Sequence, residues 1–127
     1  MSTKGRILVV DDEADLRATL AEHLAAQGYT VREAADAVAA LSSVRHERPD
    51  LVLLDVGLPG MNGLEVLRRI RQHDQTIGVI MLTGNQDAAL ARSTLQLGAI
   101  DYVFKPFEWD RLDRAVTTSM GSKKRAD

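Results

Sequence analysis

The stretch Ile7-Leu8-Val9-Val10-Asp11-Asp12-Glu13 decides the fold class of this chain. Four aliphatic residues follow one another without polar alternation, and the run ends abruptly in acidic residues. A continuous aliphatic run of this length is typical of a strand covered on both faces, as in a parallel sheet between two layers of helices. Similar runs occur at residues 51–54, 79–82 and 102–104. The weaker, partly alternating run at 30–34 predicts a strand nearer an edge of the sheet.

Helical patterns separate these runs. Leu16, Leu20 and Leu24 recur every four residues and predict a helix, and Gly28 is the expected C-terminal stop. Four more helices are predicted from the stripe Val38, Leu41 and Val44, the stripe Leu64, Leu67 and Ile70, the alanine- and leucine-rich segment 88–97, and the stripe Trp109, Leu112, Val116 and Met120. Strand and helix thus alternate five times, which predicts an α/β fold of five parallel strands with helices on both faces.

Composition narrows the class of protein. The 127 residues suit one domain, and 45% hydrophobic with 27% charged residues is an ordinary globular mixture. There is no cysteine, which excludes a disulfide framework, a thiolate zinc site and a cysteine nucleophile. The formal net charge of −2 is not that of a domain that grips nucleic acid or an anionic membrane.

The two ends of the chain carry further expectations. The N-terminus leads straight into the first strand without a signal-peptide pattern, and no apolar run approaches the ~20 residues of a membrane span, so a cytoplasmic location is expected. Residues 5–119 are predicted to form the domain. Residues 120–127 are predicted to be a frayed tail or the start of a linker, and their three basic residues are too few to argue DNA binding.

Polar residues stand where four of the five predicted strands end. In an open parallel sheet, ligands bind beyond the carboxyl ends of the strands, so these side chains should meet at one edge. The residues are Asp11 and Asp12 after the first strand, Asp55 after the third, Thr83 after the fourth and Lys105 after the fifth.

The residue types at this edge suggest a chemistry. Three carboxylates close together repel one another, and a hard divalent cation with oxygen ligands, Mg²⁺ or Mn²⁺, relieves that repulsion. A hydroxyl and an ammonium group are suited to holding phosphoryl oxygens, and an aspartate can form an aspartyl phosphate. Asp55 is the expected nucleophile because it ends the central strand before a glycine-rich loop, whereas adjacent Asp11 and Asp12 suit metal binding.

Each residue also has a plainer interpretation when taken alone. Asp11 and Asp12 could cap the following helix, because aspartate is a favourable N-cap residue. Thr83 and Lys105 could be an ordinary loop hydroxyl and an ordinary surface lysine. Their occurrence at four strand ends of one sheet favours the functional interpretation. The three histidines have no second ligand at metal spacing and are expected to be helix residues: His23, His46 and His73.

The chain resembles the receiver domain of two-component response regulators, including the single-domain chemotaxis regulator, over about residues 5–119. Each matching segment alone is weak evidence for the resemblance. All of them together, in this order and at this spacing, are highly specific for the family. The pieces are ILVVDDE (7–13), PDLVLLD (49–55), LPGMNG (58–63), LTG (82–84), GA (98–99) and DYVFKPF (101–107).

The resemblance implies a role for each matching residue. Asp55 would accept a phosphoryl group, and Lys105 would form an ion pair with that group. The Lys105–Pro106 peptide bond would be cis. Thr83 would hydrogen-bond a phosphoryl oxygen and move toward the phosphate, and Tyr102 would swing inward after it. Magnesium would be bound by Asp12 and Asp55 directly, by Asp11 through water, and by the carbonyl of Gly57.

The resemblance also implies the wider setting: a flavodoxin-like sheet in the order 2-1-3-4-5, and a signalling switch rather than an enzyme. The donor would be a sensor histidine kinase or a histidine phosphotransfer protein. The output surface would consist of the helix at 88–97, the strand at 102–104 and the helix from 109. It would contact an effector, or a second copy in a phosphorylation-dependent homodimer.

Other functions fit the sequence less well. A phosphatase of the haloacid dehalogenase type needs a second acid two residues after the nucleophile, and Gly57 stands there. A nucleotide or flavin binder would carry a glycine-rich phosphate loop, and neither G-x-G-x-x-G after the first strand nor G-x-x-x-x-G-K-[ST] occurs. A receiver that acts only as a scaffold would lack acceptor residues, and all of them are present.

Overall fold

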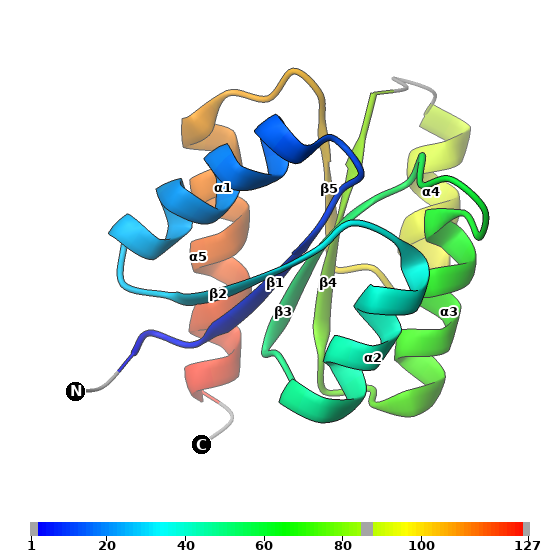
Figure 1. Ribbon diagram of the computed structural model, residues 1–127. Helices are drawn as coiled ribbons and strands as arrows, with labels where there is room; N and C mark the ends of the chain where they lie inside the picture. The colour runs from blue at the N-terminus through cyan, green and yellow to red at the C-terminus, as the bar shows by residue number, and fades with distance from the viewer. Residues whose placement is uncertain (1–2, 85–87, 126–127) are drawn as a thin grey trace.

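The computed structural model describes residues 3–84 and 88–125 (Figure 1). Within these residues, strands and helices alternate in the predicted order: β1 (Arg6–Val10), α1 (Ala14–Ala26), β2 (Thr30–Ala34), α2 (Ala37–Glu47), β3 (Leu51–Asp55), α3 (Gly63–His73), β4 (Gly78–Thr83), α4 (Ala88–Gln96), β5 (Asp101–Phe104) and α5 (Trp109–Arg125).

The five strands form one sheet in the order β2-β1-β3-β4-β5. Every pair of neighbouring strands is parallel. This confirms the predicted α/β class, the strand order that the resemblance implied, and the placement of β2 at an edge. The peptide bond between Lys105 and Pro106 is cis, as the resemblance implied.

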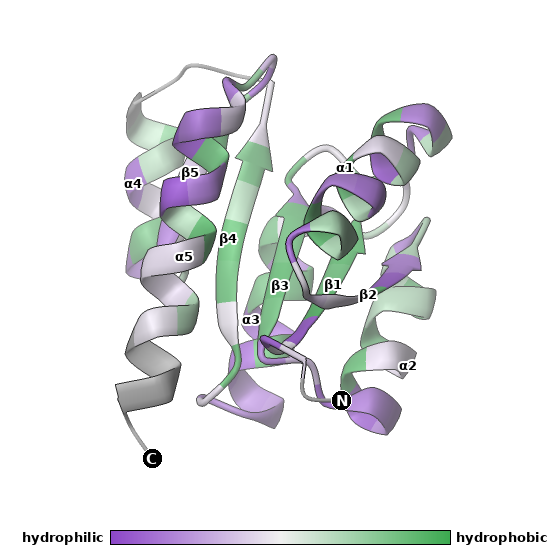
Figure 2. Ribbon diagram, turned by 90° about the vertical axis from the view of Figure 1, so that its left-hand side faces the viewer, coloured by the Kyte–Doolittle hydropathy of each residue, from purple (hydrophilic) through white to green (hydrophobic). Residues whose placement is uncertain are grey.

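Helices cover both faces of the sheet. In Figure 1, α1 and α5 lie on one face, and α2, α3 and α4 lie on the other. Successive strand residues point to opposite faces, so the sheet contributes side chains to two apolar clusters. Val9 belongs to the cluster under α1 and α5, and Val10 belongs to the cluster under α2 and α3. Figure 2 shows β1, β3 and β4 as predominantly hydrophobic, as expected for strands buried on both sides.

Side-chain caps set where two helices begin. The Asp36 carboxylate accepts a hydrogen bond from the Ala39 amide at 2.8 Å at the start of α2. The Asn62 side chain accepts one from the Glu65 amide at 3.0 Å at the start of α3. Each cap satisfies an amide that has no partner within its helix. The Asn62 cap starts α3 soon after the loop that follows β3.

The predicted stripe of α2 is wrong at one position. Val38 is 78% exposed, whereas Ala37, Ala40 and Val44 are buried. The helix begins at Ala37, after the Asp36 cap, and each residue turns about 100° around the axis. With that spacing, Ala37, Ala40 and Val44 share the buried face, and Val38 faces outward.

Helix α5 differs from expectation at both ends. Leu112, Val116 and Met120 are buried as predicted, but Trp109 is 38% exposed and lies against His23 of α1, with 4.2 Å between the ring centroids. The helical backbone continues to Arg125, where a tail or linker was expected from residue 120. Met120 is still buried, which anchors the helix as it passes this point. The domain boundary itself remains a prediction.

Candidate functional site

The sheet register brings the predicted polar residues to one edge. Val10 pairs with Leu54, so Asp11 and Asp55 follow directly on neighbouring strands. Asp55 pairs with Leu82, and the next residue, Thr83, ends β4. Lys105 follows β5 at the same edge. The expected convergence at the carboxyl ends of the strands is therefore present.

Three aspartates at this edge form a compact group. One carboxylate oxygen from each of Asp11, Asp12 and Asp55 lies within 4.8 Å of the others. Asp11 is fully buried, Asp55 is 6% exposed and Asp12 is exposed to solvent. The group thus has a buried inner part and an open outer part. Such a set of oxygens suits a hard divalent cation that retains water ligands.

Lys105 supplies the positive charge that faces these carboxylates. Its Nζ lies 2.7 Å from Asp11 Oδ2 and 3.4 Å from Asp55 Oδ2. A third carboxylate, that of Glu13, lies 3.6 Å from the same Nζ, a contact that the sequence interpretation did not foresee. The lysine side chain is only 15% exposed, so these interactions are weakly screened by solvent.

The electrostatic environment shifts the pKa values of both facing groups. Burial raises the pKa of Asp55 and the charge of Asp11 adds to the rise, although the Gly57 amide and Lys105 act in the opposite direction. Burial lowers the pKa of Lys105, but the hydrogen bond to Asp11 and the nearby carboxylate charges outweigh it and leave that pKa raised. The surroundings therefore favour the cationic form of Lys105 and disfavour the carboxylate form of Asp55 relative to water.

The loop after β3 shapes the surroundings of Asp55. The amide of Gly57 donates a hydrogen bond to Asp55 Oδ1 at 3.0 Å, so this loop glycine lies beside the predicted acceptor. Gly63, which ends the matching segment LPGMNG, packs its backbone directly against the end of β3. A Cβ atom at position 63 would overlap with the Asp55 carbonyl oxygen and the Val56 Cα. The segment LPGMNG includes this glycine, but it does not reveal the packing role, because the contact is made between two elements.

Asp11 does not cap α1 in the way that its plainer interpretation suggested. The N-cap residue of α1 is Glu13, whose side chain makes no cap hydrogen bond. The Asp11 Oδ1 atom instead accepts a hydrogen bond from the Glu13 amide at 2.9 Å, while Oδ2 faces Lys105. The carboxylate of Asp11 is thus held among the other charged groups of the carboxylate edge by the Glu13 amide and Lys105.

Thr83 and Tyr102 lie on neighbouring strands beside the carboxylates. Thr83 is 3% exposed, and its carbonyl oxygen accepts a hydrogen bond from the Lys105 amide at 2.7 Å. Tyr102 is half-buried in the middle of β5 and makes an edge-to-face contact with Phe104 at 5.3 Å between centroids. Thr83 therefore belongs to the carboxylate edge, whereas Tyr102 lies on β5 before the strand reaches it.

The histidines lie in or at the ends of helices, as expected. His23 in α1 contacts Asp113 Oδ1 through Nε2 at 2.8 Å. His46 in α2 contacts the Ser42 carbonyl through Nδ1 at 2.8 Å. His73 is the last residue of α3. Among residues 3–84 and 88–125, the possible metal-ligating group is the aspartate triad, which contains no histidine.

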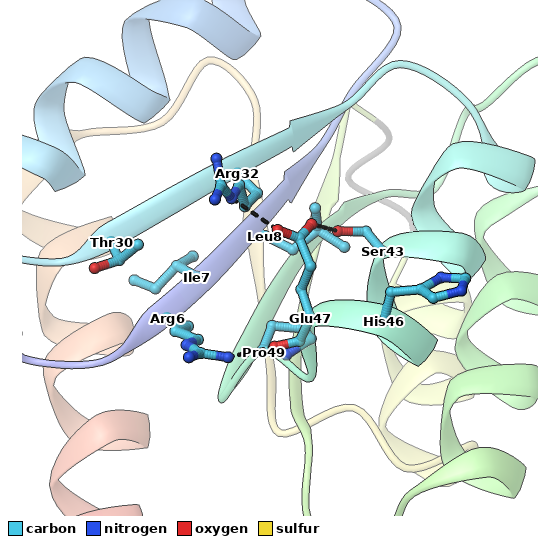
Figure 3. Close-up of a pocket in the computed structure, with 9 residues that line it drawn as sticks. All are labelled: Arg6, Ile7, Leu8, Thr30, Arg32, Ser43, His46, Glu47 and Pro49. Carbon is cyan, nitrogen blue, oxygen red and sulfur yellow. Dashed lines mark hydrogen bonds and ion pairs between the residues drawn. The ribbon is translucent and has the colours of Figure 1, made fainter.

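A separate pocket of about 240 Å³ lies between the start of β1, β2 and the end of α2 (Figure 3). Four of its lining residues, Arg6, Arg32, Ser43 and Glu47, are joined by polar contacts. Arg6 donates to the Glu47 carbonyl at 2.7 Å, Arg32 pairs with the Glu47 carboxylate at 2.8 Å, and the Ser43 hydroxyl donates to that carboxylate at 2.7 Å. The pocket lies at the other end of the strands from the aspartates, so the candidate site is the carboxylate edge.

Comparison with known proteins identifies the family. Residues 7–117 match the response regulator receiver domain. The chain belongs to the response regulator receiver domain family. A receiver domain is a signalling domain of two-component systems, in agreement with the predicted class. Among the described helices of this receiver domain, none has the length and apolar character needed to span a membrane.

Two curated relatives illustrate the range of the family. The receiver domain is 40% identical over 111 residues to sporulation initiation phosphotransferase F of Bacillus subtilis, covering 87% of this chain and 90% of that protein. It is 46% identical over 103 residues to the DNA-binding response regulator MtrA of Mycobacterium tuberculosis, covering 81% of this chain. The matched region spans 45% of the length of MtrA.

Solved structures agree with the fold. A CheY-like receiver domain protein from Methanospirillum hungatei superposes with a TM-score of 0.93 at 29% identity, covering 99% of this chain and all of that one. The receiver domain of NtrX from Brucella abortus superposes with a TM-score of 0.86 at 37% identity, covering 91% of this chain and 98% of that one. The chain thus shares the flavodoxin-like architecture of these receivers.

Proposed function

We propose that this receiver domain is a phosphorylation switch in which Asp55 accepts a phosphoryl group. The observation that carries the proposal is the position of the Asp55 carboxylate. It lies nearly buried at the end of the central strand, with Lys105 Nζ at 3.4 Å and two further aspartates beside it. A nucleophilic carboxylate, a fixed cation and a cation-binding group of oxygens are the parts that phosphoryl transfer requires.

The transfer uses a phosphohistidine of a sensor histidine kinase or of a histidine phosphotransfer protein as donor. An Asp55 carboxylate oxygen attacks the phosphorus and forms a P–O bond as the P–N bond to histidine breaks. The histidine nitrogen keeps the electron pair of that bond and takes a proton, and Asp55 becomes an acyl phosphate. Lys105 neutralises charge on the phosphoryl oxygens, and the Thr83 hydroxyl donates a hydrogen bond to one of them.

The acidic group fits a resident magnesium ion, or manganese in its place. The fit rests on the all-oxygen donor set and on the mutual repulsion of three carboxylates, which Lys105 offsets only in part. Asp12, Asp55 and the carbonyl of Gly57 would hold the ion directly and Asp11 would hold it through water. A bound ion supplies positive charge that stabilises both the carboxylates and the incoming phosphoryl group.

The switch couples the phosphoryl group to a distant surface through Thr83 and Tyr102. Tyr102 pairs with Met81, and Thr83 is two residues further along β4, so the two side chains point to the same face of the sheet. Movement of Thr83 toward the phosphate opens space into which Tyr102 turns. The surface formed by α4, β5 and α5 then changes its affinity for an effector or a second copy, which needs only ~1–3 kcal/mol of coupling.

Phosphorylation by a small donor tests the acceptor. Acetyl phosphate with Mg²⁺ should add the mass of one phosphoryl group to the intact chain. Omitting Mg²⁺ or replacing Asp55 by Asn should prevent the gain. Asp74→Asn is the matched control, because Asp74 follows α3 at the other end of the strands and should leave the gain unchanged. Full phosphorylation of Asp55→Asn would overturn the acceptor assignment.

A further inference from the structure

One arginine connects helix α1 and strand β2 to the acidic loop. Arg17 lies in α1, and its side chain is only 18% exposed. Its NH1 group donates a hydrogen bond to the carbonyl oxygen of Asp11 at 2.8 Å. Its Nε group pairs with Glu33 Oε1 of β2 at 3.1 Å. A guanidinium can make both contacts at once because its donors are held in a rigid plane.

Asp11 makes three further polar contacts besides the one with Arg17. The Asp11 amide donates to the Ala34 carbonyl at 3.2 Å at the end of β2. The two carboxylate oxygens of Asp11 accept from the Glu13 amide at 2.9 Å and from Lys105 at 2.7 Å. With Arg17 on the carbonyl oxygen, the amide, the carbonyl and both carboxylate oxygens of Asp11 all have partners.

The Asp11 carbonyl matters because it belongs to the peptide group that leads into Asp12. A peptide group is planar, so fixing this oxygen fixes the plane that connects the two Cα atoms. Asp12 is exposed, and within residues 3–84 and 88–125 no hydrogen bond holds its carboxylate. Among those residues, its direction is therefore set mainly by its backbone, which Arg17 restrains.

We propose that Arg17 is a positioning residue for the divalent-cation site, acting through the Asp11 carbonyl to direct the Asp12 carboxylate. The inference rests on the proposed function, because it requires a cation bound by Asp11, Asp12 and Asp55. Glu33 orients the guanidinium through the ion pair at 3.1 Å and offsets part of its charge. Groups behind metal ligands commonly act in this way on metal affinity.

Charge and positioning make opposite predictions for the removal of Arg17. Coulomb's law alone predicts that losing a positive charge beside the acidic loop strengthens cation binding. Loss of the restraint on Asp12 predicts weaker binding. The sign of the change in cation affinity therefore distinguishes a positioning role from a simple charge effect. A general loss of stability does not weaken cation binding in a variant that remains folded.

The test is direct binding of Mn²⁺ in the absence of any phosphodonor, followed by the loss of the free-ion signal in electron paramagnetic resonance. Arg17→Ala should bind Mn²⁺ about tenfold more weakly than the unaltered chain. Arg17→Lys keeps the charge but has a single donor group, so it should bind with intermediate affinity. Arg32→Ala is the matched control, because Arg32 joins β2 to α2 through Glu47 at 2.8 Å without touching the acidic loop.

Each outcome decides between the possibilities. Equal or tighter Mn²⁺ binding by Arg17→Ala overturns the inference while leaving the cation site standing. An equal loss in Arg32→Ala also overturns it, since the effect would then follow from any ion pair of β2. If Arg17→Ala does not fold, Arg17→Lys carries the test, and unchanged affinity in that variant overturns the inference. Failure of the unaltered chain to bind Mn²⁺ would instead reject the cation site itself, and the inference with it.

Discussion

At the scale of single residues, Asp11 is a fully buried carboxylate that depends on Lys105, whose Nζ lies 2.7 Å from Oδ2. Removing one partner of a buried ion pair leaves an uncompensated charge. Lys105→Met should therefore lower the free energy of unfolding of the metal-free protein by about 3 kcal/mol. Urea unfolding in the presence of a chelator measures this loss.

An exposed ion pair serves as the comparison for Lys105. Arg48 is 74% exposed on its side chain and contacts Asp74 at 3.3 Å. Arg48→Met should cost less than about 1 kcal/mol, because solvent screens the pair. Similar losses in the two variants would show that the charge of Asp11 is not compensated mainly by Lys105.

Asp55 should make the stability of the metal-free fold depend on pH. Its pKa in the folded state is raised, chiefly by burial, so the fold holds the Asp55 proton more tightly than the unfolded chain does. This contribution stabilises the fold below the unfolded pKa and disappears as the pH rises through the folded pKa. Asp55→Asn should accordingly be more stable than the unaltered chain at neutral pH, by about 1 kcal/mol.

Unfolding curves at several pH values check the sign. The advantage of Asp55→Asn should shrink as the pH falls toward the pKa of an unfolded aspartate, where the native side chain is also neutral. A variant that is less stable than the unaltered chain at neutral pH, without metal, would show that the Asp55 carboxylate stabilises the fold.

The residues that the sequence revealed at this scale are those that end a strand. Asp11, Asp55, Thr83 and Lys105 could be grouped because parallel strands place their ends at one edge. The contribution of Arg17 could not be found in this way. The long side chain of an arginine in a helix can reach many different partners. Its contact with a backbone carbonyl depends on how α1 packs beside β1.

At the scale of elements, Gly63 determines how closely α3 approaches β3. A Cβ atom at this position would overlap with the Asp55 carbonyl oxygen and with Val56. Both are backbone contacts that cannot move away as a flexible side chain could. Gly63→Ala should lower the free energy of unfolding by about 2 kcal/mol, as overpacking does. Because the strain falls on the backbone of Asp55, the proposed acceptor, it should also slow phosphorylation by acetyl phosphate.

A second helical glycine gives the matched control. Gly121 lies in α5, and no atom would lie within 4 Å of an added Cβ. Gly121→Ala should leave phosphorylation unchanged and should raise stability by up to about 1 kcal/mol through helix propensity. Equal phosphorylation rates in Gly63→Ala and the unaltered chain would contradict a role for this packing at the acceptor.

The order and type of the elements follow from local patterns more readily than the facing of each helix. The continuous apolar run 51–54 correctly predicted a central strand, and the weaker run 30–34 correctly predicted an edge strand. The stripe of α2 was predicted from its largest residues, which placed Val38 in the core, where Ala37 and Ala40 lie instead. A helix against a sheet can bury small residues, and apolar spacing alone does not tell which residues these are.

At the scale of the whole molecule, acidic side chains from the ends of β1 and β3 gather at one edge of a sheet that is otherwise held by two apolar layers. The fold therefore carries an electrostatic cost at this edge, which Lys105 offsets only in part. Any ligand that neutralises the carboxylates and binds only the folded chain must stabilise the entire domain, since a domain of this size is expected to unfold as a unit.

Magnesium should accordingly raise the melting temperature of the protein in a concentration-dependent way. At a free Mg²⁺ concentration ten times the dissociation constant, the gain is about 1.4 kcal/mol for one site. Asp12→Asn should abolish most of this gain, because it removes one of the proposed cation ligands. Asp12 is exposed, so its replacement leaves no buried charge without a partner. Potassium chloride at matched ionic strength controls for screening, which should act on the unaltered chain and the variant alike. An equal rise in both proteins, or in potassium chloride alone, would show that the stabilisation does not come from a cation bound at the three aspartates.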